Sequence, residues 1–137
     1  MKHIVSFMMA ATLQLVLVST TNSQGAAPLA AGSGWINELG SVMTIQSVAA
    51  NGLVTGTYIT KVGCGAGKKR SLTGWYNKGA FAFTVNFDEC ASIAAWAGQV
   101  DAGLSPKITT LWHLVLSGPP KWDGTYAGTD TFVPNSK

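Results

Sequence analysis

Charged residues are scarce in this sequence of 137 residues. Lysine, arginine, aspartate and glutamate make up only 11% of it, and the net charge of +3 falls to +2 when Lys2 is set aside with the N-terminal segment described below. A charge this small gives no argument for nucleic acid binding. The one basic run, Lys68-Lys69-Arg70, is interpreted as a solvated turn, and a nucleic-acid patch is the less favoured alternative.

Histidine and cysteine are nearly absent, and their absence excludes several kinds of site. His113 is the one histidine beyond the N-terminal segment, and Cys64 and Cys90 are widely spaced, so no zinc-binding pattern is present. The adjacent Asp88 and Glu89 point apart in a turn and do not form the carboxylate pair of a glycosidase. No phosphate-binding or dinucleotide-binding glycine motif is present either. The sequence therefore predicts a protein that is not an enzyme and that carries no metal or cofactor.

The longest apolar run, Ile4–Val18, follows the basic Lys2 and is interrupted by Gln14. It is shorter than the ~20 residues that a transmembrane helix needs, and small residues follow it, as at a signal peptidase site. We predict that residues 1–23 form an export signal, with a transmembrane anchor as the alternative, and that residues 24–33 form a flexible lead-in. A secreted protein, extracellular or periplasmic, meets oxidising conditions, so the two cysteines are expected to form a disulfide.

No segment shows a sustained helical period, and glycine and turn residues separate short runs of alternating apolar residues. Hairpin signals such as Asn51-Gly52 join most of these runs. Eight short strands favour an antiparallel up-and-down barrel or a sandwich over residues 34–133, followed by a tail over 134–137. The predicted strands are Gly34–Glu38, Val42–Val48, Leu53–Lys61, Arg70–Tyr76, Ala80–Phe87, Ser92–Val100, Lys107–Leu116 and Gly124–Phe132.

Polar residues occur on the strand faces that carry the large aromatic residues. Side chains alternate along a strand, which places Tyr58, Thr60, Ser92 and Asp130 on these faces and His113 on an opposite one. Without a histidine inside, a Ser-His-Asp or Cys-His site is excluded. Buried polar groups need hydrogen-bond partners. They predict either a cavity for a polar ligand or an internal network satisfied by its own members or by buried water, and the spacing leaves both open.

Four segments resemble the avidin family, in that family's order and spacing. They are Trp35–Ser41, Leu53–Tyr58, Thr110–Leu114 and Gly128–Phe132, and the likeness extends over about residues 34–133. The resemblance implies an all-β, eight-stranded, antiparallel, streptavidin-like barrel, an architecture for which streptavidin is a standard example. It implies non-catalytic, high-affinity binding of biotin, which serves to withhold biotin. The alternatives are a carrier of a different small ligand and a protease-inhibitor-type interaction protein.

The family's biotin-binding residues can be placed on this chain where it matches. The resemblance implies that Asn37, Ser41 and Tyr58 donate hydrogen bonds to the ureido oxygen of biotin, and that Thr60 and Asp130 accept from its N–H groups. Apolar walls would surround the rings and alkyl chain, and loop residues would lie near the carboxylate. The wall residues are Phe87, Trp96, Trp112 and Leu114, and the residues near the carboxylate are Val62, Gly63 and Ser92.

The chain departs from this pattern at several positions. Phe87 stands where avidin and streptavidin have tryptophan, and Ala94 stands where they have a threonine that faces the ligand sulfur. The cysteine pair resembles the one that joins two loops in dimeric bacterial avidins of the rhizavidin type. Trp122 resembles the tryptophan that covers a neighbouring subunit's ligand in tetrameric relatives, although packing on its own barrel is the alternative. Because both features are present, a homotetramer is predicted, with a dimer as the alternative.

Overall fold

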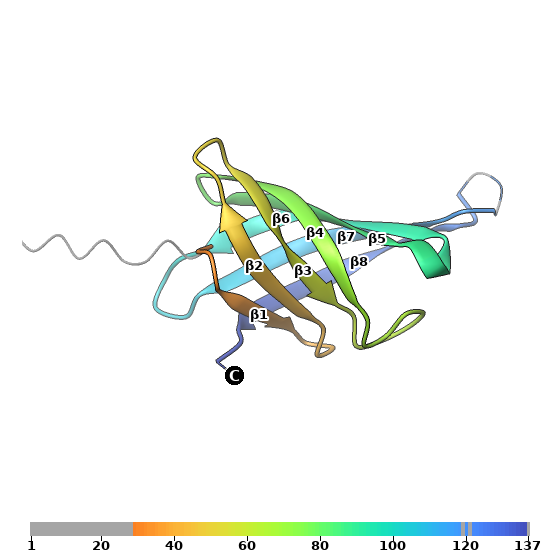
Figure 1. The fold of residues 1–137 in the computed structure, drawn as a ribbon, viewed down its shortest axis with the longest axis horizontal. Helices are drawn as coiled ribbons and strands as arrows, with labels where there is room; N and C mark the ends of the chain where they lie inside the picture. Colours follow the sequence, from red (N-terminus) through yellow and green to blue (C-terminus); the bar gives the residue numbers. More distant parts are fainter. Residues whose placement is uncertain (1–28, 119, 121, 137) are drawn as a thin grey trace, which may run out of the picture.

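A computed structural model describes residues 29–118, 120 and 122–136, and in this part of the chain eight antiparallel strands form a closed barrel (Figure 1). Each strand pairs with the next in sequence, and β8 pairs with β1 to close the sheet. This confirms the barrel and excludes the sandwich. The elements are β1 (Gly34–Asn37), β2 (Val42–Val48), β3 (Leu53–Ile59), β4 (Lys69–Asn77), β5 (Ala80–Phe87), the 3-10 turn η1 (Asp88–Cys90), β6 (Ser92–Asp101), β7 (Lys107–Leu116) and β8 (Thr125–Pro134).

The predicted strand boundaries agree with the observed ones to within two residues. β3 ends at Ile59 rather than Lys61, because the Thr60 hydroxyl donates to the Val62 carbonyl oxygen over 2.8 Å and turns the chain out of the sheet. β8 continues to Pro134 because its last residues pair with β1. The hairpin signal at Gly52 is confirmed by its φ of 90°, which favours glycine.

The up-and-down order gathers the connections at two ends of the barrel (Figure 1). We call the end with the β2–β3, β4–β5 and β6–β7 connections the closed end, and the end with the other four connections the open end. Large apolar side chains, all almost fully buried, fill the closed end, so this end holds the apolar core. They are Leu29, Trp35, Ile45, Val54, Phe81, Ile108 and Phe132.

The expected lead-in is packed over its described part, residues 29–33. Leu29 is buried in the core at the closed end. The Gly32 N–H donates to the Ile45 carbonyl oxygen over 2.8 Å, and the Ile45 N–H donates to the Ser33 carbonyl oxygen over 2.9 Å. One leucine and two backbone hydrogen bonds therefore hold a segment that is otherwise poor in large side chains. The predicted export signal lies outside the described residues.

The basic run at the start of β4 is only partly the solvated turn that the sequence predicted. Lys68 and Lys69 are exposed, but Arg70 is buried and points into the barrel. It shares its strand face with Leu72 and Gly74, which are also buried. Strand alternation therefore outweighs the usual preference of a guanidinium for solvent at this position.

No helix in the described part of the chain has the length and apolarity of a membrane span. Within the same residues, no three histidine, cysteine, aspartate or glutamate side chains gather in a way that could hold a metal ion.

Candidate ligand-binding site

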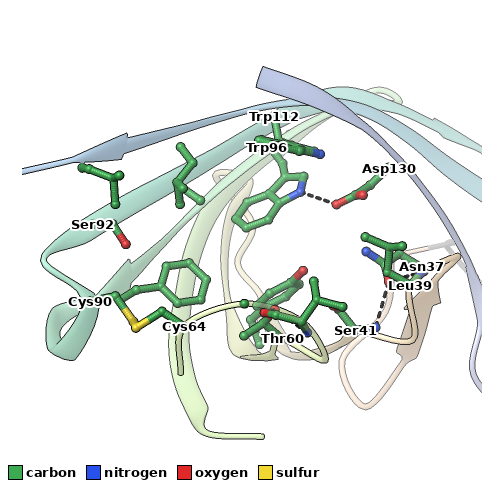
Figure 2. Close-up of a pocket in the computed structure, with 17 residues that line it drawn as sticks. Asn37, Leu39, Ser41, Thr60, Cys64, Cys90, Ser92, Trp96, Trp112 and Asp130 are labelled. Atoms are coloured by element: carbon green, nitrogen blue, oxygen red, sulfur yellow. Dashed lines mark hydrogen bonds between the residues drawn. A yellow bond between two sulfur atoms is a disulfide. The ribbon is translucent and has the colours of Figure 1, made fainter. Parts of the chain in front are cut away.

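A cavity of about 280 Å³ opens at the end of the barrel opposite the closed end. Figure 2 shows its polar groups at two places: Asn37, Ser41 and Asp130 lie together on one side, and Ser92 lies beside the disulfide on the other. Of the two expectations that the sequence left open, this space favours a ligand cavity over a filled polar network. The lining residues are Asn37, Leu39, Ser41, Tyr58, Thr60, Val62, Gly63, Cys64, Phe87, Cys90, Ser92, Ala94, Trp96, Trp112, Leu114, Leu116 and Asp130.

The turn after β1 orients two hydrogen-bond donors toward the cavity. The Asn37 side-chain oxygen accepts the Leu39 N–H over 3.1 Å and the Ser41 N–H over 2.8 Å, which leaves the amide NH₂ to donate. The Ser41 Oγ accepts the Lys61 N–H over 3.0 Å, so its hydroxyl proton also remains to donate. Both side chains are buried, and local backbone contacts fix their orientation before any ligand arrives.

Tyr58 supplies a third donor from β3. Its phenol is buried, and burial is the main reason why its pKa is raised to about 12, with hydrogen bonding to Ser41 acting in the opposite direction. The hydroxyl is therefore neutral at physiological pH and can donate. Its ring lies 5.0 Å from the Trp96 ring, centroid to centroid.

Asp130 supplies a carboxylate from β8. The Trp96 Nε1–H donates to its Oδ2 over 2.8 Å, as Figure 2 shows. Burial raises the pKa of Asp130, while hydrogen bonds from Trp96, Asn37 and Trp112 oppose this increase. The second carboxylate oxygen is the strongest acceptor that the cavity offers to a ligand N–H.

Thr60 presents an acceptor beside these groups. Its hydroxyl proton is committed to the Val62 carbonyl oxygen, while the oxygen accepts the Val62 N–H at 3.3 Å. The remaining lone pair makes Thr60 an acceptor toward the cavity. The cavity thus combines three donors and two acceptors within a small volume.

Aromatic side chains form the apolar wall. The Phe83 and Trp96 rings stack with 4.7 Å between centroids and a 7° interplanar angle. Trp96 lines the cavity and Phe83 supports it from the core. The Trp112 ring lies on the backbone of β8 at Gly128, where an added Cβ would lie 2.7 Å from the indole Cε2. Only a glycine at this position leaves room for the indole to approach the backbone this closely.

The Cys64–Cys90 disulfide that was expected is present. It joins the β3–β4 loop to η1, and both cysteines line the cavity. The loop segment that carries Val62 and Gly63 is therefore tied to the neighbouring β5–β6 connection of the rim.

Trp122 is the one predicted binding residue that does not line the cavity of its own chain. It lies in the β7–β8 connection and is 82% exposed. It also borders a surface hollow with His113, Val115 and Thr125 of its own barrel, so both interpretations of this indole stay predictions.

Sequence reasoning missed some lining residues. Leu116 could have been found, because it lies two residues after Leu114 on the same face of β7. Leu39 lies in a turn, where alternation gives no signal for the direction of a side chain. The cysteines were predicted as a staple and not as part of the wall.

Comparison with known proteins identifies the family of this chain. The model of the avidin family matches residues 26–135. This chain belongs to the avidin family. It is 34% identical to avidin of Gallus gallus over 112 residues, which cover 72% of this chain and 74% of that protein.

Solved structures of the avidin family share the barrel. Apo shwanavidin aligns with a TM-score of 0.74 and 33% identity, covering 80% of this chain and 98% of that one. A rhizavidin–biotin complex aligns with a TM-score of 0.67 and 32% identity, covering 77% and 100%. The fold expected from the avidin resemblance is thus confirmed.

Proposed function

We propose that this protein binds biotin without catalysis and withholds it from other users. The observation that carries the proposal is the cluster of three donors and two acceptors in the cavity. The ureido group of biotin has one carbonyl oxygen and two N–H groups, so it needs this complement. The rhizavidin–biotin complex, on the same fold, supports the assignment.

In the proposed complex, the ureido oxygen accepts hydrogen bonds from Asn37, Ser41 and Tyr58. Fixed donors that converge on one oxygen draw electron density onto it, as in an oxyanion hole, and need no reorganisation on binding. The Asp130 carboxylate accepts one ureido N–H, and the Thr60 hydroxyl oxygen accepts the other. Because the cluster is buried, each of these interactions is stronger than it would be in water.

The rest of the ligand would follow the cavity toward the rim. The apolar walls would enclose the bicyclic ring and the alkyl chain, which removes their apolar surface from water. The carboxylate would lie near Val62, Gly63 and Ser92, on the disulfide side of Figure 2. The walls are Phe87, Trp96, Trp112 and Leu114.

We further propose that the subunits assemble into a homotetramer, with a dimer as the alternative. The outer face of β6 and β7 exposes Ile93, Leu111 and Val115, and Ile93 pairs with Val115 in the sheet. An apolar face of this kind is typical of a subunit interface. Trp122 would then cover the cavity of a neighbouring subunit instead of its own.

We also propose that the protein is secreted, to the extracellular or periplasmic space, with residues 1–23 as its export signal. The Cys64–Cys90 disulfide supports this location, because disulfides persist in oxidising compartments.

Thermal unfolding of the oxidised protein with and without excess biotin tests the function. A ligand that binds only the folded state raises the unfolding midpoint by mass action. We expect a large upward shift with biotin and none with a biotin analogue that lacks the ureido group. An unchanged midpoint would contradict the proposal and direct the search to other small ligands.

A further inference from the structure

Arg70 is buried at the open end but does not line the cavity. With Asp130, it is one of two buried charged residues in the described part of the chain, and its side chain is only 6% exposed. Burying a guanidinium is costly unless hydrogen bonds replace its water. The proposed contacts of biotin do not use this residue, so its burial needs another explanation.

The guanidinium contacts two neighbouring connections of the cavity rim. Its Nη1 donates to the carbonyl oxygens of Gly65, over 3.0 Å, and of Lys68, over 3.1 Å, both in the β3–β4 loop. Its Nη2 forms an ion pair with the Glu89 carboxylate in η1. Its Cζ also lies 4.7 Å from the centroid of the Phe87 ring, which lines the cavity.

These contacts make a second connection between the segments that the disulfide joins. Gly65 follows Cys64 and Glu89 precedes Cys90, so the guanidinium and the disulfide join the same two segments. Gly65 has a φ of 73°, and a Cβ added there would clash with the Arg70 guanidinium. The loop is therefore shaped to receive this side chain.

The Glu89 end of the bridge keeps its charge over a wide pH range. A hydrogen bond with its own backbone amide is the largest reason why the pKa of Glu89 is lowered to about 2, and Asp88 and Arg70 add to the effect. Lys68 Nζ lies 3.4 Å from the same carboxylate. Unlike the disulfide, this set of contacts is not broken by reducing agents.

We propose that Arg70 is a positioning residue that holds the β3–β4 loop at the cavity rim in parallel with the disulfide, so that the rim stays formed when the disulfide is reduced. The inference rests on the proposed biotin site for its kinetic readout. A ligand behind the rim leaves when the rim opens, and opening requires both connections to break. Loss of either one alone should therefore matter little.

The test combines Arg70→Met with Cys64→Ser and Cys90→Ser in the full chain and measures the biotin dissociation rate. Each change alone should speed dissociation less than about threefold, and the combination by roughly thirtyfold or more, within the range for hydrogen bonds to a charged group. Lys69→Met is the matched control, because it removes the same charge from an exposed neighbour. It should have no effect in either background.

A combined effect equal to the product of the separate effects would overturn the proposal, since the two connections would then act independently. Thermal unfolding midpoints distinguish a purely structural role of Arg70. If Arg70→Met lowers the midpoint in the cysteine-free background but leaves the biotin dissociation rate unchanged, the proposal is also overturned. If Arg70→Met does not fold, Glu89→Gln breaks the same bridge from its solvent side. It should show the same dependence on the disulfide.

A second readout needs no biotin. A protease that cuts only after lysine reports loop opening at Lys68 and Lys69, which Arg70→Met leaves in place. After reduction of the disulfide, the parent should be cut slowly. Arg70→Met should be cut at least about tenfold faster, as the free energy of hydrogen bonds to a charged group implies. Equal rates would overturn the proposal. A parent that does not bind biotin, yet shows this difference, would refute the proposed function and leave the role of Arg70 standing.

Discussion

The closed and open ends of the barrel are built by the same eight strands but have different interiors. At the closed end, inward side chains such as Ile45, Ile108 and Phe132 are apolar and fully buried. At the open end, inward side chains such as Tyr58 and Asp130 are polar and surround a cavity. In β8 the change occurs between Phe132 and Asp130, which are adjacent inward positions. Alternation therefore determines which side chains point inward, while residue type divides the interior into core and site.

This division separates stability from binding. Packing at the closed end stabilises the fold, whereas the open end carries buried polar groups that reduce stability until a ligand uses them. Burial raises the pKa of Asp130, which indicates that its charge is unfavourable in the empty cavity. Each change below should therefore affect one property and spare the other.

Asp130→Ala should have the largest effect on binding. Removing a buried charged acceptor should weaken biotin binding by about 4 kcal/mol, roughly a thousandfold. Unfolding without biotin should change little, because the lost charge is itself unfavourable in the cavity. Titration calorimetry and urea unfolding measure the two quantities.

Asp130→Asn is the matched control for this change. It keeps the shape and an acceptor oxygen but removes the charge, so its loss of affinity should be smaller. An Asp130→Ala protein that binds biotin as tightly as the parent would show that this carboxylate does not contact the ligand.

Ile108→Ala should have the opposite effect at the closed end. Ile108 is fully buried, so the cavity left by truncation should lower the free energy of unfolding by about 3 kcal/mol. Biotin dissociation should be unchanged at temperatures where the variant remains folded. The control is Leu104→Ala in the β6–β7 connection at the same end, because Leu104 is fully exposed and its truncation should be neutral. Faster biotin release from Ile108→Ala would show that the two ends are coupled.

Acid pH should act on the two properties of the open end in opposite directions. The pKa of Asp130 in the folded protein is raised above 3.8, so its contribution to stability is fully present below 3.8 and is lost as pH rises through the folded value. Binding needs the ionised acceptor, so affinity should fall as pH drops through that same value. The measurement uses the amide of biotin, which has no carboxylate, so that the ligand itself does not titrate in this pH range. A pH profile that Asp130→Asn shares with the parent would contradict the assignment.

Much of the fold could be predicted from the sequence because turn residues and alternation are local signals. The strands, and the inward positions of Tyr58, Thr60, Ser92 and Asp130, follow from them. The proposed roles of Asn37 and Ser41 in a ligand site could not be obtained this way, because the turn that orients them depends on hydrogen bonds within the folded chain. The avidin resemblance supplied those roles.

Two features were missed for different physical reasons. Arg70 has the alternation of an inward residue, but its partners Gly65 and Glu89 are known only from the folded rim. Leu29 is buried because the barrel leaves space for it at the closed end, which a local pattern does not reveal.

Ala94→Thr should have the smallest effect, and it makes the open end more polar without changing its charge. Ala94 is buried, faces the cavity, and pairs with Leu114 across the sheet. A threonine hydroxyl would add one weak contact to the ligand sulfur, so biotin affinity should rise by about threefold, as for a modest neutral hydrogen bond. Ala82→Thr on the exposed face of β5 is the control and should leave affinity unchanged. A fall of more than about tenfold, the scale of an overpacked pocket, would show that the cavity around Ala94 is shaped for a ligand other than biotin.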